Sequence, residues 1–126
     1  MNFDTIFNMN TKSNDNSVMS HKQLEEYILS LPNARLDYPF DETTAVYRTA
    51  NNKMFALIAE NSDPLQISLK ADPNLSQILR DKYETVLPGY LLNKKHWNTL
   101  ILTGQLSDDE VRDLIRHSYE LVSKVV

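Results

Sequence analysis

Residues 88–100 read Pro-Gly-Tyr-Leu-Leu-Asn-Lys-Lys-His-Trp-Asn-Thr-Leu, and no other stretch of the chain gathers as much uncommon chemistry. It holds one of two glycines, the single tryptophan, the only adjacent lysine pair and one of three histidines. Lysines supply positive charge, asparagine amides donate and accept hydrogen bonds, and the rings offer flat surfaces. Proteins use such groups to bind phosphates and bases. The stretch is therefore the first candidate for a binding site.

A structural interpretation competes with this functional one. The indole of Trp97 belongs more often in a core than against a ligand, so we favour core packing for it. Tyr90 then packs beneath the loop. For Lys94 and Lys95 the two interpretations are balanced, since the pair either binds an anion or keeps an exposed turn soluble.

On the carboxyl side of this stretch, residues 99–102 predict the last strand, and residues 103–105 a turn. Ser107 and Glu110 have the spacing of a capping box, in which the side chain of each residue accepts a hydrogen bond from the backbone N–H of the other. A final helix of about 17 residues should begin there. Its predicted buried positions are Val111, Leu114, Ile115, Val122 and Val125.

On the amino side, Asp72 and Pro73 predict a helix start, with aspartate as the cap and proline in the first turn. Leu75, Ile78 and Leu79 are its predicted buried stripe. Arg80 and Lys82 fall in the last turn, where positive charge suits the helix dipole.

Four strands are predicted further upstream. Residues 34–40 contain a proline and suit a sheet edge, residues 45–49 have high β propensity, and residues 53–59 are apolar on both faces, which indicates a central strand. Residues 65–71 alternate apolar and polar side chains, so Gln66, Ser68 and Lys70 should share one wet face.

The first helix should begin at Ser20, which forms a capping box with Gln23. We interpret the polar residues 1–19 as a mobile leader, or alternatively as a segment whose Ile6 and Phe7 dock on the body. The order is thus helix, four strands, helix, strand, helix. It predicts one α+β domain over residues 20–126, with an antiparallel sheet of about five strands and helices packed on it.

Composition excludes several classes of protein. Without cysteine, there is no disulfide framework, thiolate catalysis or iron–sulfur site, and two glycines are too few for a P-loop or a dinucleotide fingerprint. No apolar run approaches the roughly 18 residues of a membrane span. We expect a cytoplasmic monomer that has no cofactor and does not bind membranes.

The charge distribution bears on the choice of partner. The net charge of −4 argues against a broad basic surface for nucleic acid. Residues 64–102 nevertheless carry +2 and the remainder −6, so the middle of the chain is the least repulsive region for an anion.

A metal site is not predicted. The three histidines are far apart in sequence and none lies in a His-Glu-x-x-His motif. Asp37, Asp41 and Glu42 form an acidic group that we interpret as a solvated turn, or as a weak cation contact or a partner-binding edge.

Taken together, several segments resemble the MmcQ/YjbR family across residues 20–125. They are Leu31-Pro32-x-Ala34, residues 37–40, 53–56 and 67–73, above all residues 88–99, and His117-Ser118-Tyr119. The resemblance implies a CyaY/frataxin-like fold with a double-wing arrangement, and a DNA-binding role. Asn33 departs from the glycine frequent there, yet asparagine also tolerates a left-handed backbone.

The resemblance selects eight candidates for ligand contact, and the residue pattern selects most of them independently. The eight are Ser68, Lys70, Asn93, Lys94, Lys95, His96, Trp97 and Asn98. The leading hypothesis is a DNA-binding module in which the lysines contact phosphates. The alternatives are a small-anion pocket at the same loop, with His96 as acid or base, and a frataxin-like metal-handling or interaction domain. No catalytic residue is assigned, and binding is favoured over catalysis.

Overall fold

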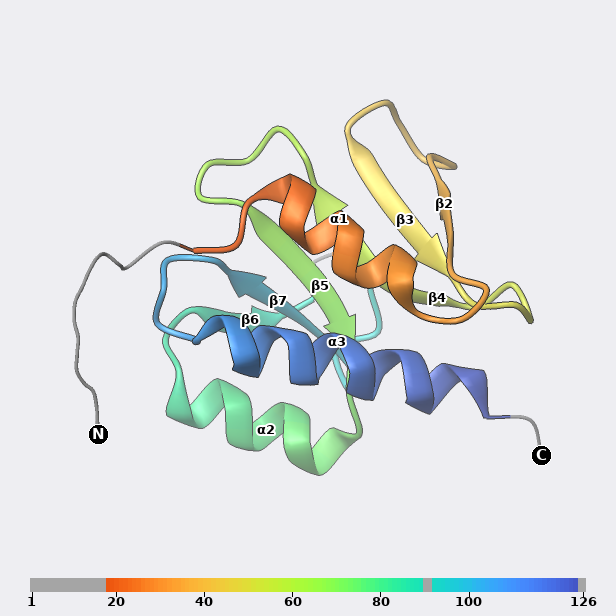
Figure 1. Ribbon diagram of the computed structural model, residues 1–126. Coiled ribbons are helices and arrows are strands. Elements are labelled where there is room, and N and C mark those ends of the chain that lie inside the picture. Colours follow the sequence, from red (N-terminus) through yellow and green to blue (C-terminus); the bar gives the residue numbers. More distant parts are fainter. Residues whose placement is uncertain (1–17, 90–91, 125–126) are drawn as a thin grey trace.

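The computed structural model describes residues 18–89 and 92–124, which form a six-stranded sheet and three helices (Figure 1). The elements follow each other as α1 (His21–Ser30), β2 (Arg35–Asp37), β3 (Thr44–Arg48), β4 (Met54–Ala59), β5 (Gln66–Lys70), α2 (Pro73–Lys82), β6 (Val86–Pro88), β7 (Trp97–Ile101) and α3 (Asp108–Ser123). The predicted α+β class is confirmed.

All strand pairs are antiparallel, and the sheet order is β2-β3-β4-β5-β7-β6. The prediction of about five strands was one short, because β6 has only three residues, ends in a proline and shows no alternation. The last predicted strand begins at Trp97 rather than Thr99. The edge position of β2 and the interior position of β4 are as the sequence predicted.

The helix starts follow the predicted caps. Ser20 and Gln23 form a complete capping box, and so do Ser107 and Glu110. The Asp72 carboxylate accepts the Leu75 N–H at 3.0 Å and so caps α2. The three helix starts are therefore fixed by hydrogen bonds between residues three positions apart, which can be predicted from the sequence.

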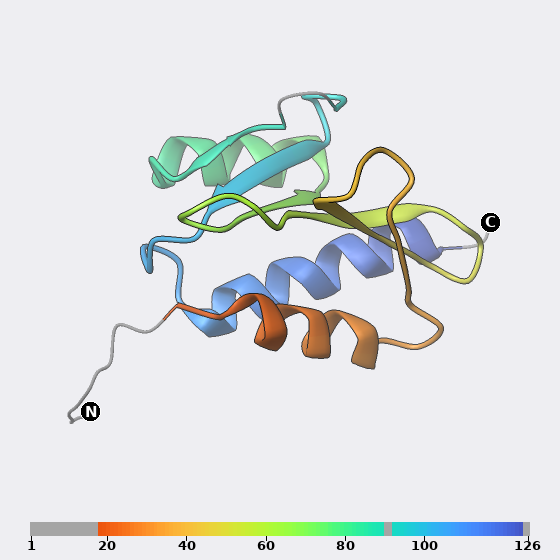
Figure 2. The same ribbon diagram turned by 90° about the horizontal axis from the view of Figure 1, so that it is seen from above.

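Helices α1 and α3 cover one face of the sheet, called here the helix face, and α2 packs at its β6–β7 edge. Figure 1 shows α3 crossing in front of the strands, with α1 above it and α2 below it, and Figure 2 shows α1 and α3 together on one side. The main core lies between them. Its fully buried side chains include Leu24 and Ile28 of α1, Ile58 and Ile67 of the sheet, and Ile115 of α3.

Helix α2 presents a different stripe from the predicted one. Ile78 was predicted to be buried, but 59% of its surface is exposed. Ser76 is buried instead, and Leu79 packs against the core. The helix lies at the β6–β7 edge of the sheet. Its contact with the sheet is narrow, so one of the three predicted apolar positions, Ile78, stays exposed to solvent.

A serine hydroxyl of α3 links two central strands. Ser118 is fully buried; its Oγ accepts the Lys70 N–H at 2.9 Å and donates to the Phe55 carbonyl at 2.6 Å. The paired register of β4 and β5 ends one residue away, at Ala56 and Leu69. The hydroxyl therefore satisfies two backbone groups that would otherwise be buried without partners.

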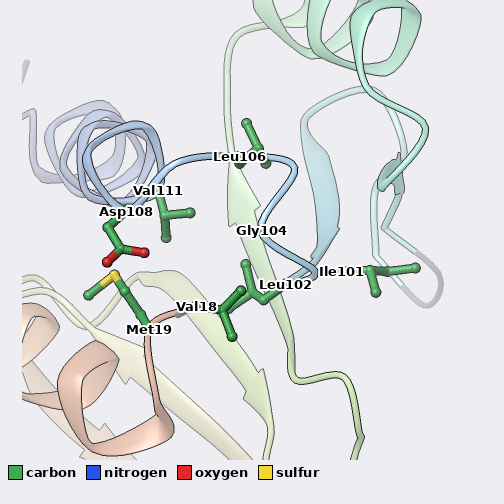
Figure 3. A pocket seen from close by; sticks show the side chains of 8 residues that line it. All are labelled: Val18, Met19, Ile101, Leu102, Gly104, Leu106, Asp108 and Val111. Atoms are coloured by element: carbon green, nitrogen blue, oxygen red, sulfur yellow. The ribbon is translucent and has the colours of Figure 1, made fainter. Parts of the chain in front are cut away.

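The chain joins the core just before α1. Met19 is buried, and with Val18 it lines a cavity of about 10 Å³ against Leu102 and Val111, which has room for about one water molecule (Figure 3). Residue 19, assigned to the leader from sequence, thus belongs to the folded body. Residues 1–17 of the predicted leader, including Ile6 and Phe7, lie outside the described residues, as does Val125.

Candidate functional site

The sheet face opposite the helices, called here the open face, carries the wet side of β5. Alternation along the strands and the antiparallel register place Gln66 beside Ile101, Ser68 beside Thr99, and Lys70 beside Trp97. Leu57 and Ala59 of β4 lie on the other side of Ser68 and Gln66. The predicted grouping of Gln66, Ser68 and Lys70 on one face is therefore confirmed.

Two loops rise from the open face and flank a pocket. Figure 2 shows the β2–β3 connection and the loop before β7 projecting on the side away from α1 and α3. The pocket has a volume of about 440 Å³, within the range of small-molecule sites. It is lined by Phe40, Asp41, Thr44, Leu57, Ala59, Gln66, Ser68, Leu92 and Thr99.

The floor of the pocket combines apolar surface with neutral hydrogen-bonding groups. Leu57 and Ala59 supply the apolar part, and Ser68 Oγ lies 2.8 Å from Thr99 Oγ1. The aromatic ring of Phe40 forms one wall, and 61% of the surface of this residue is exposed. Such a mixture suits a ligand with an apolar body and a polar edge.

Asp41 is the one charged residue among the described residues that line the pocket. Its Oδ1 accepts the N–H groups of Thr43 at 3.0 Å and Thr44 at 2.7 Å, and its Oδ2 accepts the Thr44 hydroxyl at 3.2 Å. These bonds, that of the Thr43 N–H foremost, hold the pKa of the Asp41 carboxyl below its usual value. The pocket therefore has a negatively charged rim at neutral pH.

Trp97 stabilises the open face from within. Only 6% of its surface is exposed, and it forms a second small core with Val46 and Leu57, against which Met54 and Leu92 pack. Core packing, the favoured interpretation of this tryptophan, is confirmed. Its indole is therefore not available as a stacking platform for a base.

The loop before β7 is anchored to α2 by Arg80. The guanidinium donates from Nε to Asn98 Oδ1 at 2.6 Å, and from Nη2 to the Trp97 carbonyl at 3.2 Å and to the Lys94 carbonyl. Arg80 was interpreted from sequence as a helix-capping charge. The structure keeps Arg80 in the last turn of α2 and shows that it also binds three groups on the β7 strand and its loop.

Asn98 does not face the pocket. It alternates with Trp97 and Thr99 along β7, so its side chain points to the helix face, where it is 2% exposed and bonded to Arg80. Its expected ligand contact therefore has no geometric basis. Its Nδ2 has no partner among the described protein groups.

The remaining loop candidates lie at one end of the open face. Asn93 shapes the turn, since its Oδ1 accepts the Lys95 N–H at 3.0 Å and its carbonyl accepts the N–H groups of His96 and Trp97. Lys94 and Lys95 are exposed. The His96 carbonyl accepts the Ala71 N–H at 2.7 Å, which holds this loop beside the end of β5 that carries Lys70.

Gly89 allows the two arms of this loop to meet. Its N–H donates to the Trp97 carbonyl at 2.8 Å, and a Cβ at this position would lie 2.8 Å from Trp97 Cβ. We expect Gly89→Ala to lower the free energy of unfolding by about 1–3 kcal/mol, because the strands must separate to admit the methyl group. Urea unfolding would measure the change in the free energy of unfolding. Gly104→Ala is the comparison: its φ of 95° is strained for alanine, but the added Cβ meets only the Val18 side chain, at 3.6 Å. An unchanged midpoint in Gly89→Ala would contradict the expectation.

Sequence reasoning found one side of the pocket and missed the other. The alternation in residues 65–71 identified Gln66 and Ser68, and Leu92 lies in the first candidate stretch, but nothing marked Phe40 or Asp41 as pocket residues. The available signal was the aromatic Phe40 next to a proline in a segment predicted to lie at the sheet edge, where an exposed ring is unusual.

Comparison with known proteins gives relatives of the same size and fold. The uncharacterised protein YbdF of Escherichia coli O157:H7 is 34% identical over 81% of this chain and 83% of its own length. The uncharacterised protein YjbR of Escherichia coli K12 is 30% identical over 81% and 86%.

Solved structures agree. The crystal structure of protein DR2400 from Deinococcus radiodurans superposes with a TM-score of 0.78 at 37% identity, covering 82% of this chain and 78% of that one. A protein from Pseudomonas syringae has a TM-score of 0.70 at 32% identity, with 82% and 98% covered. The family model described as YjbR matches residues 29–121. The chain therefore belongs to the YjbR family.

Proposed function

We propose that this protein is a binding module whose ligand occupies the open-face pocket. The observation that carries the proposal is the pocket itself, an apolar floor of Leu57 and Ala59 with the Ser68 and Thr99 hydroxyls between two projecting loops. A small, largely uncharged molecule with a flat apolar body and a hydrogen-bonding edge matches these surfaces. Heteroaromatic rings are the simplest compounds of this class.

The lining of the pocket argues against a small free anion as the ligand. Among the described lining residues there is no lysine, arginine or histidine, and Asp41 is held in its charged form. A bound anion would be desolvated beside a carboxylate without a compensating cation. His96 is not among these lining residues, so the proposal is binding rather than acid–base catalysis.

An NMR screen of the full chain against neutral heteroaromatic fragments and nucleosides tests the proposal. We expect shift changes that centre on the amides of Leu57, Ser68 and Thr99. Thr99→Val removes a hydroxyl while keeping the side-chain shape, so we expect it to weaken the best fragment about 5- to 10-fold, the value of one hydrogen bond. Thr103→Val, at an exposed position outside the pocket, is the matched control. If no fragment perturbs the pocket amides, or Thr99→Val binds like the wild type, the proposal fails.

A second candidate is single-stranded nucleic acid, with a base in the pocket and phosphates on the lysines. The observation that favours it is that Lys95 is exposed on the loop that contributes Leu92 to the pocket, and that Lys70 lies on the same sheet face. The net charge of −4 makes such binding weak and strongly dependent on salt.

Fluorescence anisotropy at low salt with labelled single-stranded and duplex DNA tests this candidate. Replacing Lys94 and Lys95 with alanine should abolish binding, while replacing Lys22 and Lys124, on α1 and after α3, with alanine changes the net charge equally and should weaken it little. Equal effects of the two double variants would show a response to net charge alone.

A monomeric state and a cytoplasmic location also remain predictions. Within the described part of the chain, no helix has the length and apolar character needed to cross a membrane.

A further inference from the structure

We propose that His21, Glu25 and Glu60 form a binding site for a divalent transition-metal ion. His21 and Glu25 are four residues apart in α1 and so project from the same side of the helix. Glu60 directly follows β4. The three side chains offer ligand atoms that all lie within 4.8 Å of one another, although the residues are up to 39 positions apart in the chain.

The spacing of these atoms suits a shared ion. His21 Nε2 lies 2.8 Å from Glu60 Oε2. Metal bonds of about 2.0–2.2 Å to imidazole and carboxylate place neighbouring ligands of one ion about 3 Å apart. An ion would thus replace the present His21–Glu60 hydrogen bond with two coordinate bonds, and Glu25 offers a third ligand atom within 4.8 Å of the other two.

Two tyrosines hold the carboxylates from outside the cluster. Tyr47, a fully buried residue of β3, donates its hydroxyl to Glu25 Oε1 at 3.0 Å, and Tyr38 donates to Glu60 Oε2 at 2.7 Å. Such outer partners orient ligating carboxylates in metal sites.

The ligand set indicates the class of ion. One imidazole with two carboxylates suits Zn²⁺, Mn²⁺, Fe²⁺ or Co²⁺ better than Mg²⁺ or Ca²⁺, which prefer oxygen alone. The side chains of His21 and Glu60 are 36% and 22% exposed, which leaves room for an ion to enter and for water to complete its coordination. The acidic group considered from the sequence is a different one, since Asp37, Asp41 and Glu42 all lie outside this cluster.

The site shares no residue with the described lining of the open-face pocket. Tyr47 packs in the main core of the helix face, whereas the pocket lies on the opposite face of the sheet. A protein that binds metal but no fragment, or the reverse, would therefore separate the two proposals.

Calorimetry of the full chain with Zn²⁺ alone tests the metal site. We expect one ion per chain, with affinity reduced more than about 10-fold in Glu60→Gln and in His21→Gln. Glu26→Gln, on the same helix but outside the cluster, should bind like the wild type. Thermal unfolding without metal would show that each variant is folded, and Mg²⁺ in large excess should not displace the zinc.

The position of the ion needs a separate readout. Mn²⁺ should broaden the amide signals of residues 21, 25 and 60 first. The proposal is overturned by the absence of saturable zinc binding, by equal losses in Glu26→Gln and Glu60→Gln, or by broadening that centres on the three acidic residues in the first turn of α3.

Discussion

Replacing Ser118 with alanine should lower the free energy of unfolding by about 2–4 kcal/mol, because the lost hydroxyl joins two strands. The Lys70 N–H and the Phe55 carbonyl would both lose their hydrogen bond in a core position. A buried polar group left without a partner costs about 1–3 kcal/mol, and two are affected. Urea unfolding followed by circular dichroism measures the change.

A second buried serine provides the matched control. Ser76 of α2 is as buried as Ser118, but its Oγ has no hydrogen-bond partner among the described groups. Ser76→Ala should therefore leave the free energy of unfolding unchanged or raise it by about 0.5–1 kcal/mol, since alanine also favours helix. If both variants lose the same stability, the bridge formed by Ser118 is not the cause.

Replacing Arg80 with methionine should cost about 2–3 kcal/mol and loosen the loop before β7. Methionine keeps much of the apolar stem but leaves Asn98 Oδ1 buried without its Arg80 donor, and it removes one hydrogen bond from each of the Trp97 and Lys94 carbonyls. The tryptophan emission should shift to the red as water reaches the indole. Urea unfolding and fluorescence of the same samples measure both effects.

Arg116→Met separates this role from a general loss of positive charge. Arg116 is exposed on α3, so its replacement should change the unfolding midpoint little. Equal destabilisation by the two variants, or an unchanged tryptophan spectrum in Arg80→Met, would contradict the assigned anchor.

What the sequence predicted well is what depends on near neighbours. The capping boxes at Ser20 and Ser107 need residues only three positions apart, and both form. The alternation of Gln66, Ser68 and Lys70 follows from the geometry of one strand. Burial of Trp97 follows from its large apolar surface.

What it missed depends on distant partners. The orientation of Asn98 follows from a strand that starts at Trp97, and its hydrogen bond comes from Arg80, 18 residues earlier. Ile78 is exposed because α2 lies over the edge of the sheet, which no helical periodicity reveals. The pocket joins Phe40 to Leu92 across the sheet, and the metal cluster joins α1 to the end of β4.

The fold does not determine which hydroxyl on the pocket floor donates a hydrogen bond and which accepts one. In the Ser68–Thr99 hydrogen bond either oxygen can be the donor. When both hydroxyl hydrogens rotate, the hydroxyl that offered a lone pair to the ligand offers a proton instead, and the other hydroxyl does the reverse. The same cavity can thus match a ligand in either tautomer, or two ligands whose donor and acceptor edges are exchanged, without any movement of the heavy atoms. Selectivity in this pocket would then rest on shape and on Asp41 rather than on hydrogen-bond direction.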